Sequence, residues 1–414
     1  MREVSNVAMN RVNTSYAETR DLGSSTSQLH DAPVVRFVNQ LLLDAVKKGA
    51  SDIHLEPYEH QFRIRFRVDG LLRETESPAS KISGRIASRI KIMAHMDISE
   101  RRLPQDGQIK LQLSDSHTIE LRISTLPTRW GEKVVIRMFD ASRVRLDIHE
   151  LGFSENQKNL YLQGLHRSQG LVLVTGPTGS GKTVTLYTGL NLLNTLERNI
   201  STAEEPIEIN LEGINQVAVN PKIGLSFAGA LRAFLRQDPD VLMVGEIRDT
   251  ETAEIAIQAA QTGHLVLSTL HTNSAAETVS RLRQMGIPNF NLATSINLII
   301  AQRLSRRLCP HCKQEGELPA SVLKEQGFRS VGVDAIRIFK PLGCAWCQNG
   351  YQGRLGIYEV VPMTQRLTDC ILTNGNASEL AREIQRAGFP NLREAALNKV
   401  KEGVISLEEA NRLT

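Results

Sequence analysis

The first part of the chain carries apolar residues in two different periods, and together they predict a small α+β domain. An apolar stripe at helical spacing follows Asp31, which we expect to cap a helix with Pro33 in its first turn. Alternation with a period of two then predicts strands at 62–68, 109–113 and 119–123. A further helix is expected between the first and second of these strands, at roughly 81–96.

Residues typical of turns lie next to these strands and help to define the domain. The pairs Asp69-Gly70 and Asp106-Gly107 are typical of tight turns, and another turn is expected near 114–116. Antiparallel strands joined in this way predict a domain at 31–140, followed by a linker at 141–150. Residues 1–30 are polar and show no period, so we expect a poorly ordered arm there.

From Gly152 onward the pattern changes to alternating strands and helices. Strands are predicted at 171–175, 216–219, 241–244 and 265–269, and helices at 184–194, 225–237, 250–262 and 275–285. Such alternation is typical of an α/β domain in which helices wrap a parallel sheet. Ligands of such sheets bind at the carboxyl ends of the strands, so residues just after each strand carry the most weight.

Composition narrows the class of protein only slightly. The 414 residues include 49 Lys and Arg against 45 Asp and Glu, and the two signs are interspersed, so no single-sign field demands nucleic acid or an acidic membrane. A chain of this length is expected to form two or three domains. It has no apolar stretch near the ~18 residues of a bilayer span and no signal-peptide core, so we expect a cytosolic protein.

A glycine-rich loop follows the first predicted strand of the α/β region, in the stretch LVLVTGPTGSGKT at 171–183. A bare glycine loop is usually only a turn, but this one fits G-x-x-x-x-G-K-[ST] between a strand and a helix. Backbone N–H groups and the helix dipole would hold phosphates, Lys182 would reach the β- and γ-phosphates, and Thr183 would hold Mg²⁺. The predicted ATP site comprises Gly176, Pro177, Thr178, Gly179, Ser180, Gly181, Lys182 and Thr183.

An acidic residue follows the strand at 241–244, in the pair Gly245-Glu246. A nucleotide hydrolase needs an acid at such a position, near the attacking water or the hydrated Mg²⁺. Glycine stands here where many such enzymes have an aspartate, so Mg²⁺ would rely on Thr183 and water. Glu246 is therefore the candidate general base, and the alternative is a solvated acid at a strand end.

Two further sets of polar residues follow short strands. Glu204 and Glu205 come after the β-prone run 200–203, where they could position water and metal or could be surface charge; their spacing does not decide. His271 follows the strand LVLSTL, and a histidine there can contact the γ-phosphate and report its loss. A lone histidine is, however, more often a structural hydrogen-bonding group.

Cysteines occur in two C-x-x-C pairs, and disulfides are not expected in the cytosol. Two such pairs predict a tetrahedral, closed and structural zinc site with the ligands Cys309, Cys312, Cys344 and Cys347. Redox activity is the alternative, and His311 could compete as a ligand. Cys370 has no partner in the sequence and is expected to fill space in a core.

Taken together, several stretches resemble the secretion ATPases of the type II secretion and type IV pilus assembly family. The matching stretches are SDIHLEP (51–57), FRVDG (66–70), RLPQDGQI (102–109), LVTGPTGSGKT (173–183), LRQDPDVLMVGEIRD (235–249), TGHLVLSTLHTN (262–273) and the C-x-x-C pairs. The match runs from about Asp31 to the C-terminus. It implies a hexameric ring whose subunits have a PAS-like N-terminal domain, a RecA-like ATPase core at 151–302, a zinc module at 303–360 and a helical region at 361–414.

The resemblance also implies roles for single residues. The stretch EEPIE at 204–208 is similar to the acidic box of the family, which makes Glu204 and Glu205 ligands of Mg²⁺ and water, although the family usually has Glu-Asp there. His271 falls in a stretch similar to the histidine box. Family members send arginines to neighbouring nucleotides, and Arg122 and Arg137 stand in the corresponding stretches, where a solvated strand face is an adequate alternative.

The resulting hypothesis is a cytosolic ATPase motor that powers assembly of a type IV pilus or a type II secretion pseudopilus. It implies a homo-hexamer held at the inner membrane by a platform protein. Family members often dock on this platform through an extra N-terminal domain; we expect only the polar arm in its place here, which leaves the mode of recruitment open.

Three alternatives to this hypothesis remain. The first is a RecA-like ATPase acting on nucleic acid, which the mixed charge and the low aromatic content disfavour. The second is a pilus retraction motor, which by resemblance the C-x-x-C pairs disfavour. The third is a nucleotide-gated scaffold without turnover.

Overall fold

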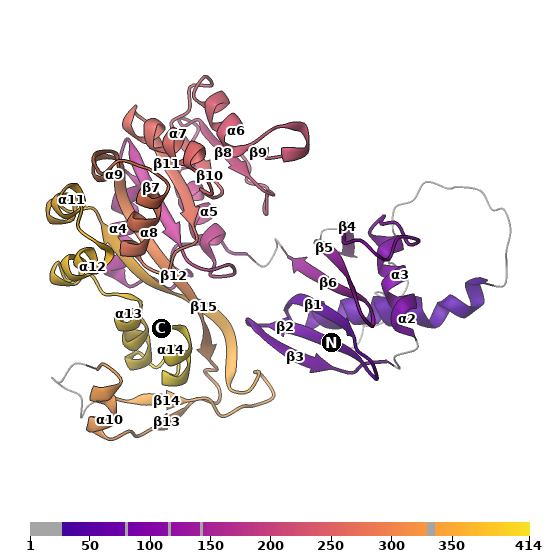
Figure 1. Cartoon of the computed structure of the whole chain (residues 1–414). Coiled ribbons are helices and arrows are strands. Elements are labelled where there is room, and N and C mark those ends of the chain that lie inside the picture. Colours follow the sequence, from indigo (N-terminus) through magenta and orange to yellow (C-terminus); the bar gives the residue numbers. More distant parts are fainter. Residues whose placement is uncertain (1–26, 79–81, 115–116, 141–143, 329–335) are drawn as a thin grey trace. The chain divides into compact units, whose positions relative to one another are not determined.

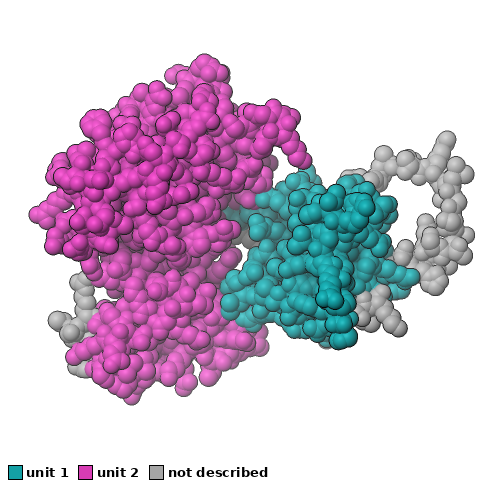
Figure 2. Space-filling view, in the orientation of Figure 1, with its two compact units in different colours: residues 1–144 teal, residues 145–414 magenta. Residues whose placement is uncertain are grey.

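The computed structural model describes residues 27–78, 82–114, 117–140, 144–328 and 336–414. Most of the predicted polar arm and of the turn expected near 114–116 lies outside these residues. The chain divides into two compact units, Met1–Val144 and Arg145–Thr414, which Figure 2 distinguishes by colour.

The first unit is an antiparallel sheet whose one face is covered by helices (Figure 1). Its elements are α2 (Ser27–Lys47), β1 (Ala50–Pro57), β2 (Phe62–Val68), β3 (Leu71–Thr75), α3 (Ser83–Met93), β4 (Gln105–Ser114), β5 (His117–Thr128) and β6 (Gly131–Phe139). The six strands lie in the order β3-β2-β1-β6-β5-β4.

Strict alternation explains why this sheet has one apolar and one charged face. In β2, which reads FRIRFRV, the four apolar residues are buried and the three arginines lie on the opposite face. The apolar face packs against α2 and α3 in a core that includes Val38, Ile53, Ile90 and Ile136. The outer face is held by cross-strand ion pairs, such as the one between Arg65 and Glu56.

The two Asp-Gly pairs adopt different structures. Asp69 (φ 49°) and Gly70 (φ 84°) both adopt the left-handed conformation between β2 and β3, which confirms the predicted tight turn. The turn predicted at Asp106-Gly107 is wrong, because both residues lie within β4. A Cβ on Gly107 would lie 2.6 Å from the carbonyl oxygen of Ala94, so glycine serves a close approach between segments here.

The N-terminal helix begins earlier than the sequence predicted. α2 starts at Ser27, so the assignment of Asp31 as its cap is wrong, and Pro33 lies inside the helix. Proline removes one backbone hydrogen bond, yet here the helix continues through it. The predicted apolar stripe is confirmed, since Val34 and Val38 are both buried in the core of the first unit.

The second unit is built around a seven-stranded sheet of order β15-β12-β7-β11-β10-β8-β9. Its elements up to the last parallel strand are α4 (Glu155–Leu165), β7 (Gly170–Thr175), α5 (Lys182–Leu193), β8 (Ile200–Glu204), β9 (Asn215–Ala218), the 3₁₀ helix η3 (Pro221–Ile223), α6 (Phe227–Phe234), β10 (Val241–Val244), α7 (Thr250–Gln261), β11 (Leu265–Leu270), α8 (Ala275–Gln284), α9 (Asn289–Ser295) and β12 (Ile296–Leu308). All strands predicted between 171 and 269 and all helices predicted between 184 and 285 are present.

The strand order makes the carboxyl end of β7 different from the ends of the other strands. β7 pairs in parallel with both β11 and β12, while the chain leaving β7 passes to the far side of the sheet before it returns. The carboxyl end of β7 is therefore a switch point, where loops diverge and leave room for a ligand.

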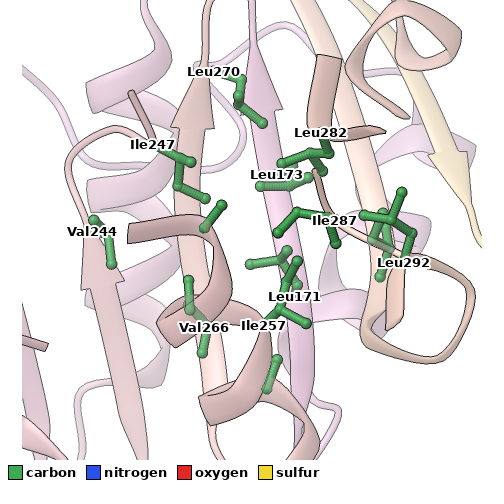
Figure 3. Packing of buried hydrophobic residues seen from close by; sticks show 14 of the residues in the cluster. Leu171, Leu173, Val244, Ile247, Ile257, Val266, Leu270, Leu282, Ile287 and Leu292 are labelled. Atoms are coloured by element: carbon green, nitrogen blue, oxygen red, sulfur yellow. The ribbon is translucent and has the colours of Figure 1, made fainter. Parts of the chain in front are cut away.

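Helices cover both faces of this sheet because its strands are apolar on both sides. Leu171 and Leu173 of β7 share one core with Ile257 of α7, Leu282 of α8 and Leu292 of α9, all of which are labelled in Figure 3. A second core, which contains α4 and α5, forms on the other face. Strands buried on both faces read as continuous apolar runs, as the sequence of β7 does.

A long antiparallel ribbon completes the sheet and carries the cysteine pairs. Its second strand, β15 (Tyr351–Pro362), pairs with β12 over nearly its whole length. The predicted boundaries at 302/303 and 360/361 therefore fall inside strands. Between the two strands lie β13 (Gln314–Gly316), α10 (Ala320–Glu325) and β14 (Ile338–Lys340). The chain ends with α11 (Gln365–Leu372), α12 (Ala377–Arg386), α13 (Leu392–Lys401) and α14 (Leu407–Leu413).

The segment predicted as a linker, 141–150, is partly integrated into the second unit. Ile148 is buried and joins the core that contains Tyr161 and Leu165 of α4. The last residues of the predicted linker thus add apolar contacts to that unit. Within the described ranges, no helix has both the length and the apolar character needed to cross a bilayer.

Candidate functional site

The glycine-rich loop lies at the switch point, between β7 and α5. Gly176 (φ 150°), Gly179 (φ 77°) and Gly181 (φ 89°) adopt backbone conformations that other residues rarely reach. A Cβ on Gly176 would also lie 2.7 Å from the hydroxyl oxygen of Ser180 across the loop. The backbone therefore requires glycine at the positions where the sequence pattern has it, as a phosphate-binding loop does.

Two polar side chains in this loop are suited to an anionic ligand. Lys182 Nζ donates to the carbonyl oxygens of Gly176 at 2.9 Å and Pro177 at 3.2 Å. Burial lowers the pKa of Lys182 to about 8, although the nearby Glu246 carboxylate acts to raise it. The Ser180 hydroxyl is buried and, among the residues described, has no hydrogen-bond partner. A buried ammonium and an unsatisfied hydroxyl fit a ligand rich in anionic oxygen atoms, such as a nucleotide triphosphate.

The other residues of the loop are accessible. Pro177, Thr178 and Gly179 are exposed, so a ligand can approach from this side. Thr183 is exposed in the first turn of α5, next to Lys182. Its hydroxyl is thus accessible and would be able to hold a hydrated Mg²⁺ ion.

An acidic cluster lies at the same edge of the sheet, beyond β10 and β11. Glu246 follows β10 and accepts a hydrogen bond from His271 Nε2 at 3.2 Å, through the oxygen Oε2. The other oxygen, Oε1, pairs with Arg248. Burial favours a raised pKa for Glu246, but Arg248 and His271 outweigh it and lower the pKa below its ordinary value. Glu246 is therefore ionised at neutral pH, as a base must be.

Arg248 connects two of the predicted acidic residues. Its second terminal nitrogen, Nη1, donates to Glu205 Oε2 at 2.9 Å, so one guanidinium bridges Glu205 and Glu246. A Cβ on Gly245 would lie 3.3 Å from the carbonyl oxygen of Ala203, which leaves little room for the aspartate found in other hydrolases. The structure thus brings together Glu205, Glu246 and His271, as the sequence led us to expect.

Glu204 is placed differently from its neighbour. Its carboxylate is buried and accepts hydrogen bonds from the hydroxyls of Tyr187 and Thr202 and from the amide of Gln216. These contacts tie β8 to α5 and β9, and they occupy both carboxylate oxygens. The observed position supports a structural contribution, and coordination of Mg²⁺ or water by Glu204 stays a prediction.

The two predicted arginines belong to the first unit and are neighbours there. Arg122 on β5 and Arg137 on β6 are directly paired on these two adjacent strands. Arg137 Nε lies 3.4 Å from Asp52 Oδ1, and Arg122 Nε lies 3.7 Å from Glu120 Oε1. Both line a groove of about 980 Å³ on the charged face. Their contact with a neighbouring nucleotide stays a prediction.

Four cysteines form a compact cluster at the end of the β12–β15 ribbon, after β12 ends and before β15 begins. The sulfur atoms of Cys309 and Cys344 lie 3.9 Å apart, those of Cys312 and Cys347 3.6 Å, and all four lie within 4.8 Å of one another. Tetrahedral zinc with Zn–S bonds of ~2.3 Å separates its sulfur ligands by about 3.8 Å, so the cluster fits such an ion. His311 is exposed and is not part of the cluster among the described residues.

Some residues of the site were not singled out in the sequence. Arg248 stands in the matched stretch 235–249, two residues after Glu246, but nothing in the pattern marks it as a partner of Glu205. Gln302 interrupts the apolar run of β12 and is buried beside the phosphate loop. A polar residue in the middle of a buried strand is a signal that could have identified Gln302.

Comparison with known proteins adds independent information. A family model described as "Type II/IV secretion system protein" matches residues 27–412. The "Type IV pilus assembly ATPase PilB" of Pseudomonas aeruginosa is 58% identical over 405 residues, which cover 96% of this chain and 72% of that protein. The "Type II secretion system ATPase E" of Vibrio cholerae is 47% identical over 387 residues, which cover 93% of this chain and 76% of that protein.

A solved structure supports the fold. The pilus retraction motor PilT with bound ADP is similar at a TM-score of 0.61 and 26% identity, covering 91% of this chain and 96% of that chain. Identity to the assembly and secretion ATPases is thus much higher than to the retraction motor, which favours the assembly class over the retraction alternative. With an α/β ATPase fold, a phosphate loop at its switch point and a match over nearly its whole length, the chain belongs to the type II/IV secretion system protein family of ATPases.

Proposed function

We propose that this protein is an ATP-hydrolysing motor that powers assembly of a type IV pilus or a type II secretion pseudopilus. The observation that carries the proposal is the placement of the phosphate loop and the ionised Glu246 at one edge of one sheet. The 58% identity with a pilus assembly ATPase gives this site its biological context.

The chemistry assigns a role to each side chain of the second unit. The loop and Lys182 would hold the phosphates, and Thr183 would hold Mg²⁺, which would supply positive charge to the phosphate oxygens. Glu246 accepts a proton from the attacking water. His271, which hydrogen bonds to Glu246, senses whether the γ-phosphate is present. Glu205 is held through Arg248 beside the same carboxylate and orders water around the metal.

The remaining parts of the proposal concern assembly. The first unit is a PAS-like domain, the core of the second unit is RecA-like, and six copies form a ring at the cytosolic face of the inner membrane, where a platform protein recruits them. Arg122 and Arg137, whose groove carries an excess of cationic groups, contact the nucleotide of a neighbouring subunit. The four-cysteine cluster holds zinc as a structural ion.

Phosphate release from Mg-ATP by the purified protein tests the catalytic part. Lys182→Ala should abolish nucleotide binding, whereas Glu246→Gln should bind ATP and fail to hydrolyse it. A wild-type protein that takes up no ATP in the presence of Mg²⁺ would contradict the proposal as a whole.

Chromosomal replacement tests the biological part. A strain that carries only the Glu246→Gln allele should lose surface pili if the protein serves pilus assembly, or lose export of secreted proteins if it serves secretion. A strain that keeps both would show that the ATPase works elsewhere.

A further inference from the structure

Gln302 on β12 lies against the phosphate loop at two places and against the helix that follows it. Its side-chain nitrogen Nε2 donates to the carbonyl oxygen of Ser180 at 2.6 Å. Its side-chain oxygen Oε1 accepts from the hydroxyl of Thr185 at 2.9 Å. Its main-chain oxygen lies so close to Gly176 that a Cβ there would be only 2.5 Å away. One buried residue outside the loop thus touches its beginning, its end and the helix that follows.

The bond to Ser180 fixes the direction of a backbone donor. In a trans peptide the C=O of one residue and the N–H of the next lie in one plane and point in opposite directions. Because the carbonyl of Ser180 is held toward Gln302, the N–H of Gly181 is held away from β12. Gly181 is the N-cap of α5, so this N–H is among the donors that a helix leaves free for an anion.

Gln302 itself is held firmly from two sides. The residue before it, Ala301, pairs with Thr175, the last residue of β7. The guanidinium of Arg303 donates to the main-chain oxygen of Gln302 at 3.0 Å and to Asn273 Oδ1 at 2.9 Å. Because its main chain is held at these two points and its side chain is buried, Gln302 can order the loop before a ligand arrives, which lowers the entropy cost of binding.

We propose that Gln302 is a positioning residue for the nucleotide: its carboxamide orients the peptide between Ser180 and Gly181 for contact with phosphate. The inference rests on the proposed function, since it assumes that the loop binds a nucleotide. Gln302 lies on β12, outside both the glycine-rich loop and the acidic cluster, so the inference gives β12 a role in nucleotide affinity. Gln302 touches no reacting atom, so its effect is on binding of the nucleotide rather than on the chemical step.

Asn297 provides a matched control on the same strand. Its side-chain nitrogen donates to the carbonyl oxygen of Gln169 at 2.7 Å, next to the opposite end of β7. Asn297→Leu therefore removes a side-chain bond that β12 makes at the start of β7, whereas Gln302→Met removes the bonds that β12 makes to the loop and to α5. If lost stability alone raised Kd, Asn297→Leu should show a rise in Kd in proportion to the fall in its melting temperature.

The experiment compares the Kd for ADP, the KM and kcat for ATP, and the melting temperature among full-length variants. Gln302→Met should raise Kd and KM by about 10- to 100-fold, because the N–H of Gly181 loses its hydrogen bond to a charged phosphate oxygen. The value of kcat should stay within about threefold of wild type. Thr185→Val should raise Kd in the same direction, and Thr185→Ser, which keeps the hydroxyl, should restore it. Asn297→Leu should keep the wild-type Kd even where its melting temperature falls.

Two results would overturn the inference while leaving the proposed function intact. One is an unchanged Kd in Gln302→Met, and the other is an equal rise in Kd in Asn297→Leu. Should Gln302→Met fail to fold, the pair Thr185→Val and Thr185→Ser decides, since equal Kd values in these two variants contradict the inference. A wild-type protein that binds no ADP and no ATP would remove both the inference and the function on which it rests.

Discussion

His271 Nε2 lies 3.2 Å from Glu246 Oε2, and this contact joins the ends of two adjacent strands, β10 and β11. Arg248 pairs with the other oxygen of the same carboxylate, so two basic side chains flank the candidate base. The arrangement holds Glu246 in one orientation and lowers its pKa. A carboxylate held in this way is ionised at neutral pH, and its reactivity depends on how the two neighbours respond to a bound nucleotide.

Replacing the base should separate binding from turnover. Glu246→Gln keeps the shape of the side chain but removes the proton acceptor, so kcat for ATP should fall by about 10²- to 10⁴-fold. The Kd for ATP, measured with a fluorescent analogue, should stay close to wild type. Glu251→Gln, which changes an exposed glutamate that pairs with Arg232 on α6, is the matched control and should hydrolyse ATP normally. Normal turnover by Glu246→Gln would exclude Glu246 as the base.

Removing the guanidinium next to the base should move the acid limb of the pH profile. In Arg248→Gln, burial of Glu246 is no longer opposed by a full positive charge, so its pKa rises. On acidification, Glu246 then takes up its proton at a higher pH than in wild type. The lower inflection of the plot of kcat against pH should therefore shift to higher pH. Arg232→Gln removes a surface ion pair and should leave the inflection in place. A profile of Arg248→Gln that coincides with that of wild type would contradict this reading of the cluster.

Nucleotide affinity should itself depend on pH through Lys182. Its pKa of about 8 means that the ammonium loses its proton as the pH rises through 8, and a neutral amine attracts phosphate less strongly. The Kd for ADP should therefore rise between pH 7 and pH 9, and binding at pH 8.5 should take up protons from the buffer. Calorimetry in two buffers of different ionisation enthalpy measures that uptake. Binding without proton exchange at pH 8.5 would show that the pKa of Lys182 is not lowered in solution.

The cysteine cluster predicts a metal content that can be counted. Wild-type protein should contain about one zinc ion per chain, and Cys312→Ser should lose it together with several degrees of melting temperature. Cys370→Ser is the control, because Cys370 packs against a different core and lies outside the cluster. A metal content that is equally high in Cys312→Ser and in wild type would argue against the four-cysteine site.

Local pattern was sufficient for the parts of the site that consecutive residues form. The phosphate loop, the strands before it and after it, and the position of Glu246 at the end of β10 all follow from short stretches of sequence. Apolar runs of four to six residues between helical segments leave few alternatives to a parallel sheet. For this reason the α/β core was predicted with its elements in the right places.

Tertiary contacts decided what the sequence could not. Glu204 and Glu205 are adjacent, yet one is buried by Tyr187 and Gln216 while the other is partly exposed and pairs with Arg248. Tyr187 and Gln216, which bind Glu204, and Arg248, which binds Glu205, all lie more than ten residues away along the chain, so spacing alone could not separate the roles of the two glutamates. The turn assigned to Asp106-Gly107 failed for a similar reason, because the close approach that requires glycine comes from a segment before it.

The position of β12 has a practical consequence for any shortened version of this protein. β7, which leads into the phosphate loop, is covered on one side by β11 and on the other by β12. A chain cut before Ile296 would lack β12, so β7 would become an open, apolar sheet edge. Its backbone N–H and C=O groups on that side would have no strand to pair with. Such edges recruit further copies of themselves, so the fragment should precipitate on expression. The sheet is complete only when β15 has been synthesised, late in translation.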